Sequence, residues 1–164
     1  MKQLILLRHG VAEPHVTVGI ADDDRRLTPK GEKKLEAVGE GLVRLGYEFD
    51  RIFTSPLPRA RQTAEVVAER LDEEDRVENV EILRPGNSAS SIRDWVVTRP
   101  EKRVMLVGHN PNLTELLGLL IGFEGLELPF DLAKGGLAVL SSNDGESFRL
   151  ELLITAKTFS RLED

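Results

Sequence analysis

Apolar residues along the chain form two kinds of pattern, short continuous runs and longer stretches with helical spacing. The runs 4–7 and 104–107 are typical of buried strands, and polar residues follow each of them. Leu35, Val38 and Leu42 recur three or four positions apart, which is the spacing of one helix face. The whole pattern predicts strands at 4–7, 50–54, 77–83, 104–107, 135–141 and 148–154. It predicts helices over 28–45, 55–71, 88–97 and 110–120.

Proline marks the start of three of these helices. Thr28-Pro29 and Ser55-Pro56 each combine a side chain that can cap a helix with a proline suited to the first helical position, and Asn110-Pro111 also precedes a helix. Strand and helix therefore alternate, which favours an α/β fold. We expect a three-layer α/β/α sandwich in which a mostly parallel, mixed sheet carries helices on both faces. The length of 164 residues suits one domain over 1–164.

Composition narrows the class of protein. The net charge of −6 argues against a general nucleic-acid binder, which usually has a basic surplus. The chain has no cysteine, so disulfides, thiol catalysis and cysteine-ligated zinc are excluded. The apolar run near the N-terminus is too short for a signal peptide, and no stretch is long enough to span a membrane. These features predict a cytoplasmic protein without a membrane partner.

The residues with the most chemical potential follow the predicted strands. They are Arg8-His9-Gly10, the segment 55–61 and Gly108-His109-Asn110. Ligands of open α/β sheets bind at the carboxyl ends of strands, so we expect these three segments to form one site. The last two lie near helix N-termini, where free N–H groups favour an anion.

Arginine and histidine side chains at such a site favour phosphoryl chemistry. A guanidinium group donates to two phosphate oxygens at once, and a histidine can form a covalent intermediate. Phosphoryl transfer depends mainly on positioning and on stabilising charge around the phosphorus. Arginines and histidines can supply both, so we expect neither a cofactor nor a metal ion. No histidine pair at helical i, i+4 spacing suggests a metal site.

Three segments carry a family resemblance: Leu7-Arg8-His9-Gly10, 54–64 (TSPLPRARQTA) and Val107-Gly108-His109-Asn110-Pro111. They resemble, in family order, the motifs of the histidine phosphatase (phosphoglycerate mutase-like) superfamily. The resemblance implies that His9 is the nucleophile and becomes a transient phosphohistidine. It implies that Arg8 and Arg59 hold the phosphoryl oxygens and that His109 donates to the same group.

The short chain resembles the SixA-type phosphohistidine phosphatases within that superfamily. Arg25-Arg26-Leu27-Thr28 with Gly31 resembles that group's Arg-x-Leu-Thr-x-x-Gly segment, which implies that Arg25 reaches the substrate phosphate. Gly10 and Asn110, which belong to the motifs, are expected to contribute to substrate binding.

A missing carboxylate supports the same subfamily. Phosphoesterases of the superfamily typically place an acidic residue after the second-motif helix, whereas residues 84–91 contain none; Glu81 precedes this segment and Asp94 follows it. An alkoxide leaving group needs a proton, but an imidazole leaving from a P–N bond is less demanding. We therefore expect a phosphohistidine-bearing protein, such as a phosphorelay component, as the partner.

Two other functions remain open on the sequence. One is a small-molecule phosphomonoesterase of the same superfamily, and the other is a non-catalytic module that binds phosphorylated partners. Simpler roles are also open for single residues. Arg25 could pair with the adjacent acidic run 22–24, and Arg59 with Glu65. His15 is expected to be a loop residue, and Lys134 could bind phosphate or belong to a loop.

Overall fold

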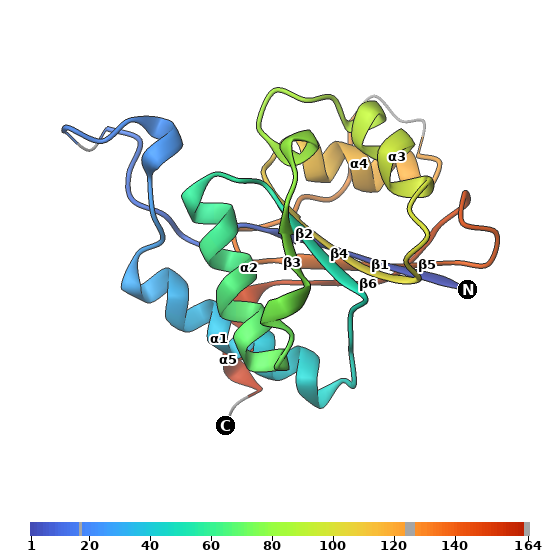
Figure 1. The fold of residues 1–164 in the computed structure, drawn as a ribbon, viewed down its shortest axis with the longest axis horizontal. Coiled ribbons are helices and arrows are strands. Elements are labelled where there is room, and N and C mark those ends of the chain that lie inside the picture. Colours follow the sequence, from blue (N-terminus) through green and yellow to red (C-terminus); the bar gives the residue numbers. More distant parts are fainter. Residues whose placement is uncertain (17, 124–126, 163–164) are drawn as a thin grey trace.

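A central sheet of six strands organises the protein in the computed structural model, which describes residues 1–16, 18–123 and 127–162 (Figure 1). The strands lie in the order β3-β2-β4-β1-β5-β6. The first four of these pair with one another in parallel, whereas β5 pairs antiparallel with both β1 and β6. The mixed, mostly parallel sheet is confirmed. The strands are β1 (Lys2–Arg8), β2 (Arg51–Thr54), β3 (Val77–Asn79), β4 (Arg103–Gly108), β5 (Leu137–Ser142) and β6 (Arg149–Ile154).

Helices cover both faces of this sheet, as expected for three layers. Figure 1 shows α1 (Pro29–Arg44), α2 (Pro58–Leu71) and α5 (Ala156–Arg161) on one side, and α3 (Ala89–Val97) and α4 (Asn112–Leu120) on the other. Each face has its own buried cluster: Ile5 and Leu7 point toward the first group of helices, whereas Leu4 and Leu6 point toward the second. The alternation of side chains along β1 therefore serves both cores.

The start of α1 follows directly from its sequence. The Thr28 hydroxyl accepts a hydrogen bond from the Gly31 N–H, and Pro29 occupies the first helical position. A Cβ on Gly31 would lie 2.2 Å from the Val11 carbonyl oxygen, so only glycine fits this approach. Leu35 and the apolar residues that follow it at helical spacing are buried as predicted.

The start of α2 differs from the prediction. Ser55-Pro56 was expected to cap the helix, but α2 begins at Pro58. The reason is the second proline, because a residue that precedes proline is pushed out of the helical region. Leu57 is accordingly extended, with φ −65° and ψ 138°. Ser55 is thereby released from capping and is free to make a different contact, described below.

Short elements also differ from the predictions. The expected strand 77–83 ends at Asn79 and continues as a 3₁₀ turn over Glu81–Leu83. The helix α5 and a 3₁₀ turn at Asp22–Asp24 were not predicted, because both are too short to show a periodic apolar pattern.

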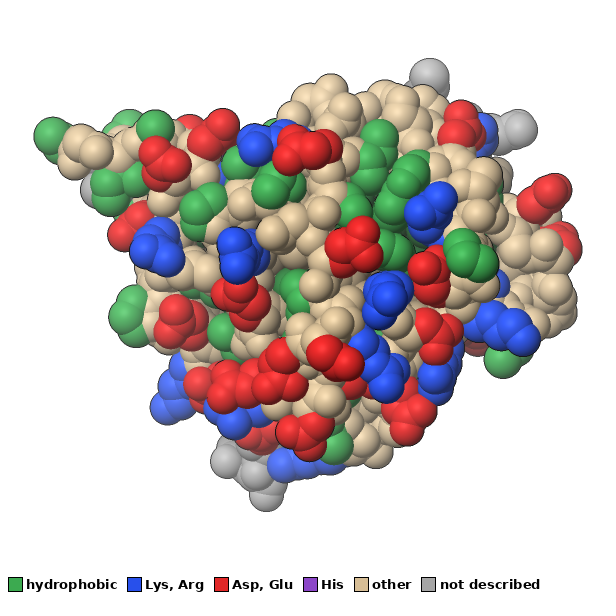
Figure 2. Space-filling model, viewed as in Figure 1, with side chains coloured by type: hydrophobic (Ala, Val, Ile, Leu, Met, Phe, Trp, Pro, Cys, Tyr) green, Lys and Arg blue, Asp and Glu red, His purple; other side chains and the backbone are tan. Residues whose placement is uncertain are grey.

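Acidic and basic side chains are interspersed on the face shown in Figure 2, rather than divided into an acidic and a basic half. Among the described residues, no helix combines the length and the apolar character needed to cross a bilayer.

Candidate active site

The carboxyl ends of β1, β2 and β4 bring the predicted residues together. His9 directly follows β1 and His109 directly follows β4; the two strands are paired in parallel, with Arg8 opposite Gly108. The His9 N–H donates to the Gly108 carbonyl at 3.0 Å. The centroids of the two imidazole rings lie 5.2 Å apart, so the sheet register alone places the histidines side by side.

His9 is held as a neutral base. Its Nδ1 lies 2.8 Å from the Gly10 carbonyl oxygen, which can only accept, so Nδ1 carries the proton and Nε2 keeps its lone pair. Burial above all, together with the charges of Arg59, Arg8 and Lys134, lowers the pKa of His9 to about 4 against the opposing effect of the Gly10 hydrogen bond. Near pH 7 the ring therefore presents an unprotonated nitrogen suited to nucleophilic attack.

His109 is also neutral but is oriented differently. Its Nε2 lies 2.9 Å from the Ser55 hydroxyl oxygen. Its Nδ1 is buried and has no hydrogen-bond partner in the described part of the chain. Burial lowers the pKa of His109 to about 3, with further contributions from His9 and from the two arginines Arg59 and Arg8.

Arg8 and Arg59 have spare donors inside the same cluster. One terminal nitrogen of Arg8 donates to the Leu132 carbonyl at 2.8 Å, and one of Arg59 donates to the Asp22 carbonyl at 2.9 Å. The Nε atoms of both arginines are buried without a partner among the described residues. Together with Nδ1 of His109, three buried nitrogens of the site thus lack a hydrogen-bond partner among the described residues. An anionic oxygen would supply an acceptor for the two guanidinium donors.

Arg25 joins this cluster through an acidic neighbour. It is 5% exposed, and its Nε donates to Asp22 Oδ1 at 2.8 Å. Arg59 lies 3.7 Å from the same carboxylate, so the two guanidinium groups are neighbours. Burial and then the positive charge of Arg25 lower the pKa of Arg59. Arg25 therefore pairs with the acidic run and also lies beside the site.

Two further residues of this region were not predicted as part of it. The Asp22 carboxylate lies 3.7 Å from Arg59, and its pKa stays below the ordinary value because Arg25 and His15 donate to it despite some opposing desolvation. His15, expected to be an isolated loop residue, has its Nδ1 2.7 Å from Asp22 Oδ1. The only sequence signal for Asp22 was its position three residues before Arg25.

Gly10 and Asn110 make hydrogen bonds that fix the backbone beside His9 and His109. The Gly10 N–H donates to the Thr63 hydroxyl at 3.0 Å, and a Cβ on Gly10 would lie 2.7 Å from Leu35. The Asn110 amide nitrogen donates to Asp131 at 2.7 Å, and its oxygen accepts from Thr114 at 3.0 Å. Their contribution to substrate binding stays a prediction.

Comparisons with known proteins agree with this geometry. Residues 4–84 match the histidine phosphatase superfamily (branch 1). An uncharacterised protein of Picosynechococcus sp. is 37% identical over 145 residues, which cover 85% of each chain. The crystal structure described as the phosphohistidine phosphatase SixA from Agrobacterium tumefaciens superimposes with a TM-score of 0.81 at 26% identity, covering 94% of this chain and 97% of that one. This chain belongs to the histidine phosphatase superfamily.

A more distant relative differs in length. The mitochondrial serine/threonine-protein phosphatase Pgam5 of Drosophila melanogaster is 35% identical over 86 residues, which make up 52% of this chain and 29% of that protein. The family membership and the site together support phosphatase chemistry for this histidine phosphatase.

The carboxylates nearest the segment 84–91 are paired with neighbouring arginines. Glu81 lies 2.5 Å from Arg84, and Asp94 lies 2.8 Å from Arg93. Asp131 accepts from Asn110 and from the Thr114 hydroxyl. Each of these carboxylates already serves a local structural contact.

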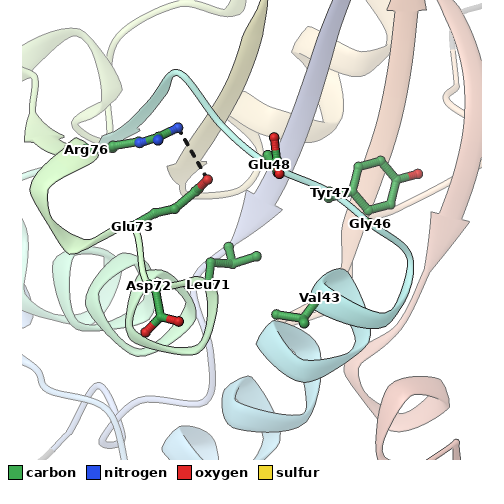
Figure 3. A pocket seen from close by; sticks show the side chains of 8 residues that line it. All are labelled: Val43, Gly46, Tyr47, Glu48, Leu71, Asp72, Glu73 and Arg76. Carbon is green, nitrogen blue, oxygen red and sulfur yellow. Dashed lines mark ion pairs between the residues drawn. The ribbon is translucent and has the colours of Figure 1, made fainter.

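A separate hollow lies near the amino end of β2, away from the carboxyl ends that form the site. It has a volume of about 380 Å³ and is lined by the ends of α1 and α2 and the turns that follow them (Figure 3). Glu73 accepts the Phe49 N–H and pairs with Arg76 at 3.4 Å, the contact dashed in Figure 3. This arrangement fixes the fold rather than offering a reactive group.

Proposed function

We propose that this histidine phosphatase removes the phosphoryl group from phosphohistidine on a protein substrate, through a covalent intermediate on His9. The observation that carries the proposal is a neutral His9, whose Nε2 makes no hydrogen bond to the described residues, in one cluster with three buried nitrogens of Arg8, Arg59 and His109 that lack hydrogen-bond partners. The phosphorus of a phosphoryl group is an electrophile that carries several anionic oxygens. An unprotonated imidazole can attack the phosphorus while the unpartnered groups beside it bind the oxygens.

The proposed reaction has two steps. Nε2 of His9 attacks phosphorus in line, the N–P bond to His9 forms, and the P–N bond of the substrate breaks; the leaving imidazole takes up a proton from water. Water then attacks the phosphorus of phospho-His9, and inorganic phosphate leaves with His9 regenerated. Arg8, Arg59 and His109 hold the phosphoryl oxygens in both steps, and Arg25 adds positive charge beside Arg59.

The preference for a P–N substrate rests on the protonation state of the nearby carboxylates. Asp22 is held as an anion by its cationic and imidazole neighbours, so it is a poor proton donor at neutral pH. Glu81 and Asp94 are engaged with Arg84 and Arg93. An imidazole leaving group tolerates the lack of a general acid better than an alkoxide does.

A second candidate function is hydrolysis of a phosphate ester. It is favoured by the likeness to Pgam5, whose name assigns it a serine/threonine-protein phosphatase activity. Asp131 is the candidate donor of a proton to the alkoxide, because it lies close enough to Arg8 for its charge to oppose the lowering of the Arg8 pKa by burial.

The test measures phosphate release from a phosphohistidine-bearing protein, a phosphoserine peptide and a small phosphate monoester, each with EDTA present. We expect fast release from the first substrate, unaffected by EDTA, and its loss in His9→Ala. An acid-labile, alkali-stable phosphoryl group should be trapped on the wild type only. Faster release from either ester would replace the first proposal with the second. Tight phosphate binding without turnover would indicate a binding module.

A further inference from the structure

Ser55 is a fully buried hydroxyl that the proposed mechanism has not yet used. It follows β2 directly, and its backbone N–H donates to the Val107 carbonyl at 3.0 Å, which fixes its position against β4. Its hydroxyl oxygen accepts the Leu57 N–H at 3.3 Å and lies 2.9 Å from His109 Nε2. The side chain thus connects the second motif to the histidine of the third.

The hydroxyl proton of Ser55 has one available acceptor. A hydroxyl carries a single proton and two lone pairs, and the Leu57 N–H already uses one lone pair. If His109 carried its proton on Nε2, Ser55 would accept from both neighbours, and its own proton would be buried without an acceptor among the described residues. If Nε2 is unprotonated, Ser55 donates to it and every group in the contact is satisfied.

The second arrangement determines which atom of His109 faces the anion. A neutral imidazole with an unprotonated Nε2 carries its proton on Nδ1. Nδ1 is the atom that is buried without a partner, in the cluster that also contains the unpartnered Nε atoms of Arg8 and Arg59. A protonated Nδ1 attracts a phosphoryl oxygen, whereas a bare Nδ1 would repel it.

We propose that Ser55 is a positioning residue that holds His109 in the Nδ1–H tautomer, so that His109 donates a hydrogen bond to the phosphoryl group. The proposal deepens the proposed function and rests on it for its catalytic consequence. The contrast with His9 is informative. Both rings carry the proton on Nδ1, but His9 directs Nδ1 to the Gly10 carbonyl and keeps Nε2 for attack, whereas His109 directs Nε2 to Ser55 and keeps Nδ1–H for donation.

The pKa of His109 is lowered to about 3, so the ring is neutral near pH 7. A neutral ring carries one proton on either Nδ1 or Nε2, whereas a doubly protonated ring would have no tautomers. The groups that face this ring are His9, Arg8 and Arg59, which disfavour a further positive charge, and Asp22, which favours one.

The first test is a direct measurement on the wild type by ¹⁵N NMR of the imidazole nitrogens near pH 7, with and without inorganic phosphate. The chain has 3 histidines, so His9→Ala and His15→Ala variants suffice to assign the signals of His109. We expect protonated Nδ1 and unprotonated Nε2 for His109 in both conditions. A proton on Nε2 in either condition would overturn the proposal.

The second test compares Ser55→Ala with Thr54→Val. Thr54 is equally buried and its hydroxyl donates to a backbone carbonyl, so the control removes a neighbouring buried hydroxyl without touching His109. We expect Ser55→Ala to show a mixture of His109 tautomers and a kcat lowered about tenfold to a hundredfold, with a smaller change in KM. Thr54→Val should keep both properties. A Ser55→Ala variant with an unchanged tautomer and kcat would contradict the role of Ser55.

The two proposals fail in different ways. A wild type that carries the proton on Nδ1 but releases phosphate from no substrate would refute the proposed function and leave the tautomer assignment in place. A wild type that is active with the proton on Nε2 would refute the role of Ser55 and leave the function standing.

Discussion

Two regions at opposite ends of the sheet, the surroundings of Glu73 and the candidate site, treat buried polar groups in opposite ways. At the amino end of β2, Glu73 is buried with both carboxylate oxygens engaged by the Phe49 N–H, and it also pairs with Arg76. At the carboxyl ends, donors of Arg8, Arg59 and His109 are buried without partners in the described residues. An unsatisfied buried donor destabilises a fold by about 1–3 kcal/mol, so a ligand that supplies the missing acceptors at the site would bind favourably. The paired region around Glu73 stabilises the fold, and we propose that the unpaired nitrogens of the site bind the phosphoryl group.

The largest expected effect comes from removing the proposed nucleophile, His9, from the site. We expect His9→Ala to lower kcat/KM by about 10,000-fold or more, because no other group can form the covalent intermediate. The free energy of unfolding should change little, since a buried imidazole surrounded by cations contributes little stability. Steady-state kinetics and urea denaturation measure the two quantities. A kcat/KM within tenfold of the wild type would contradict the role of His9.

The next effect distinguishes two arginines on α2. We expect Arg59→Ala to lower kcat/KM about 100-fold to 1,000-fold, because it removes a donor to the phosphoryl oxygens. Arg61 is the matched control, since its Nε pairs with Glu65 at 2.8 Å on the surface. Arg61→Ala should change kcat/KM by less than about twofold. Equal losses in both variants would mean that the second motif acts through general charge rather than through a specific contact.

A substitution at the paired end should show the reverse pattern. We expect Glu73→Ala to lower the free energy of unfolding by about 2–3 kcal/mol, because the Phe49 N–H loses a buried acceptor. Its kcat should remain at the wild-type value when measured well below the unfolding temperature. A loss of kcat without a loss of stability would show that this end also takes part in function.

The smallest effect, taken per pH unit, is a dependence of stability on pH. The pKa of His9 is lowered to about 4 and that of His109 to about 3 in the folded state, whereas the unfolded value lies near 6.5. The unfolded chain therefore binds more protons below pH 6.5, and stability falls as pH falls through this window. Each histidine contributes up to about 1.4 kcal/mol per pH unit. Urea denaturation from pH 7 to pH 4 should show a shallower slope in His9→Ala than in the wild type, and equal slopes would contradict the assigned shift.

Much of the fold and the centre of the site could be predicted from local sequence. The helix α1 has a cap, a proline and a periodic apolar face within one continuous stretch. His9 and His109 each follow an apolar strand, so their meeting at one edge of the sheet follows from parallel pairing. The start of α2 was misplaced by two residues because two prolines compete for the first helical position and the choice between them depends on the conformation of Leu57.

Local sequence thus determined which segments form strands and helices and which reactive residues end up at the sheet edge. Tertiary structure alone decided how those residues are used. Ser55 meets His109 across 54 positions in the sequence, and Arg59 meets the Asp22 carbonyl across 37. A helix cap or an apolar period is set by neighbours within a few residues, whereas the tautomer of a histidine and the donors left without acceptors depend on which distant groups share the same buried volume.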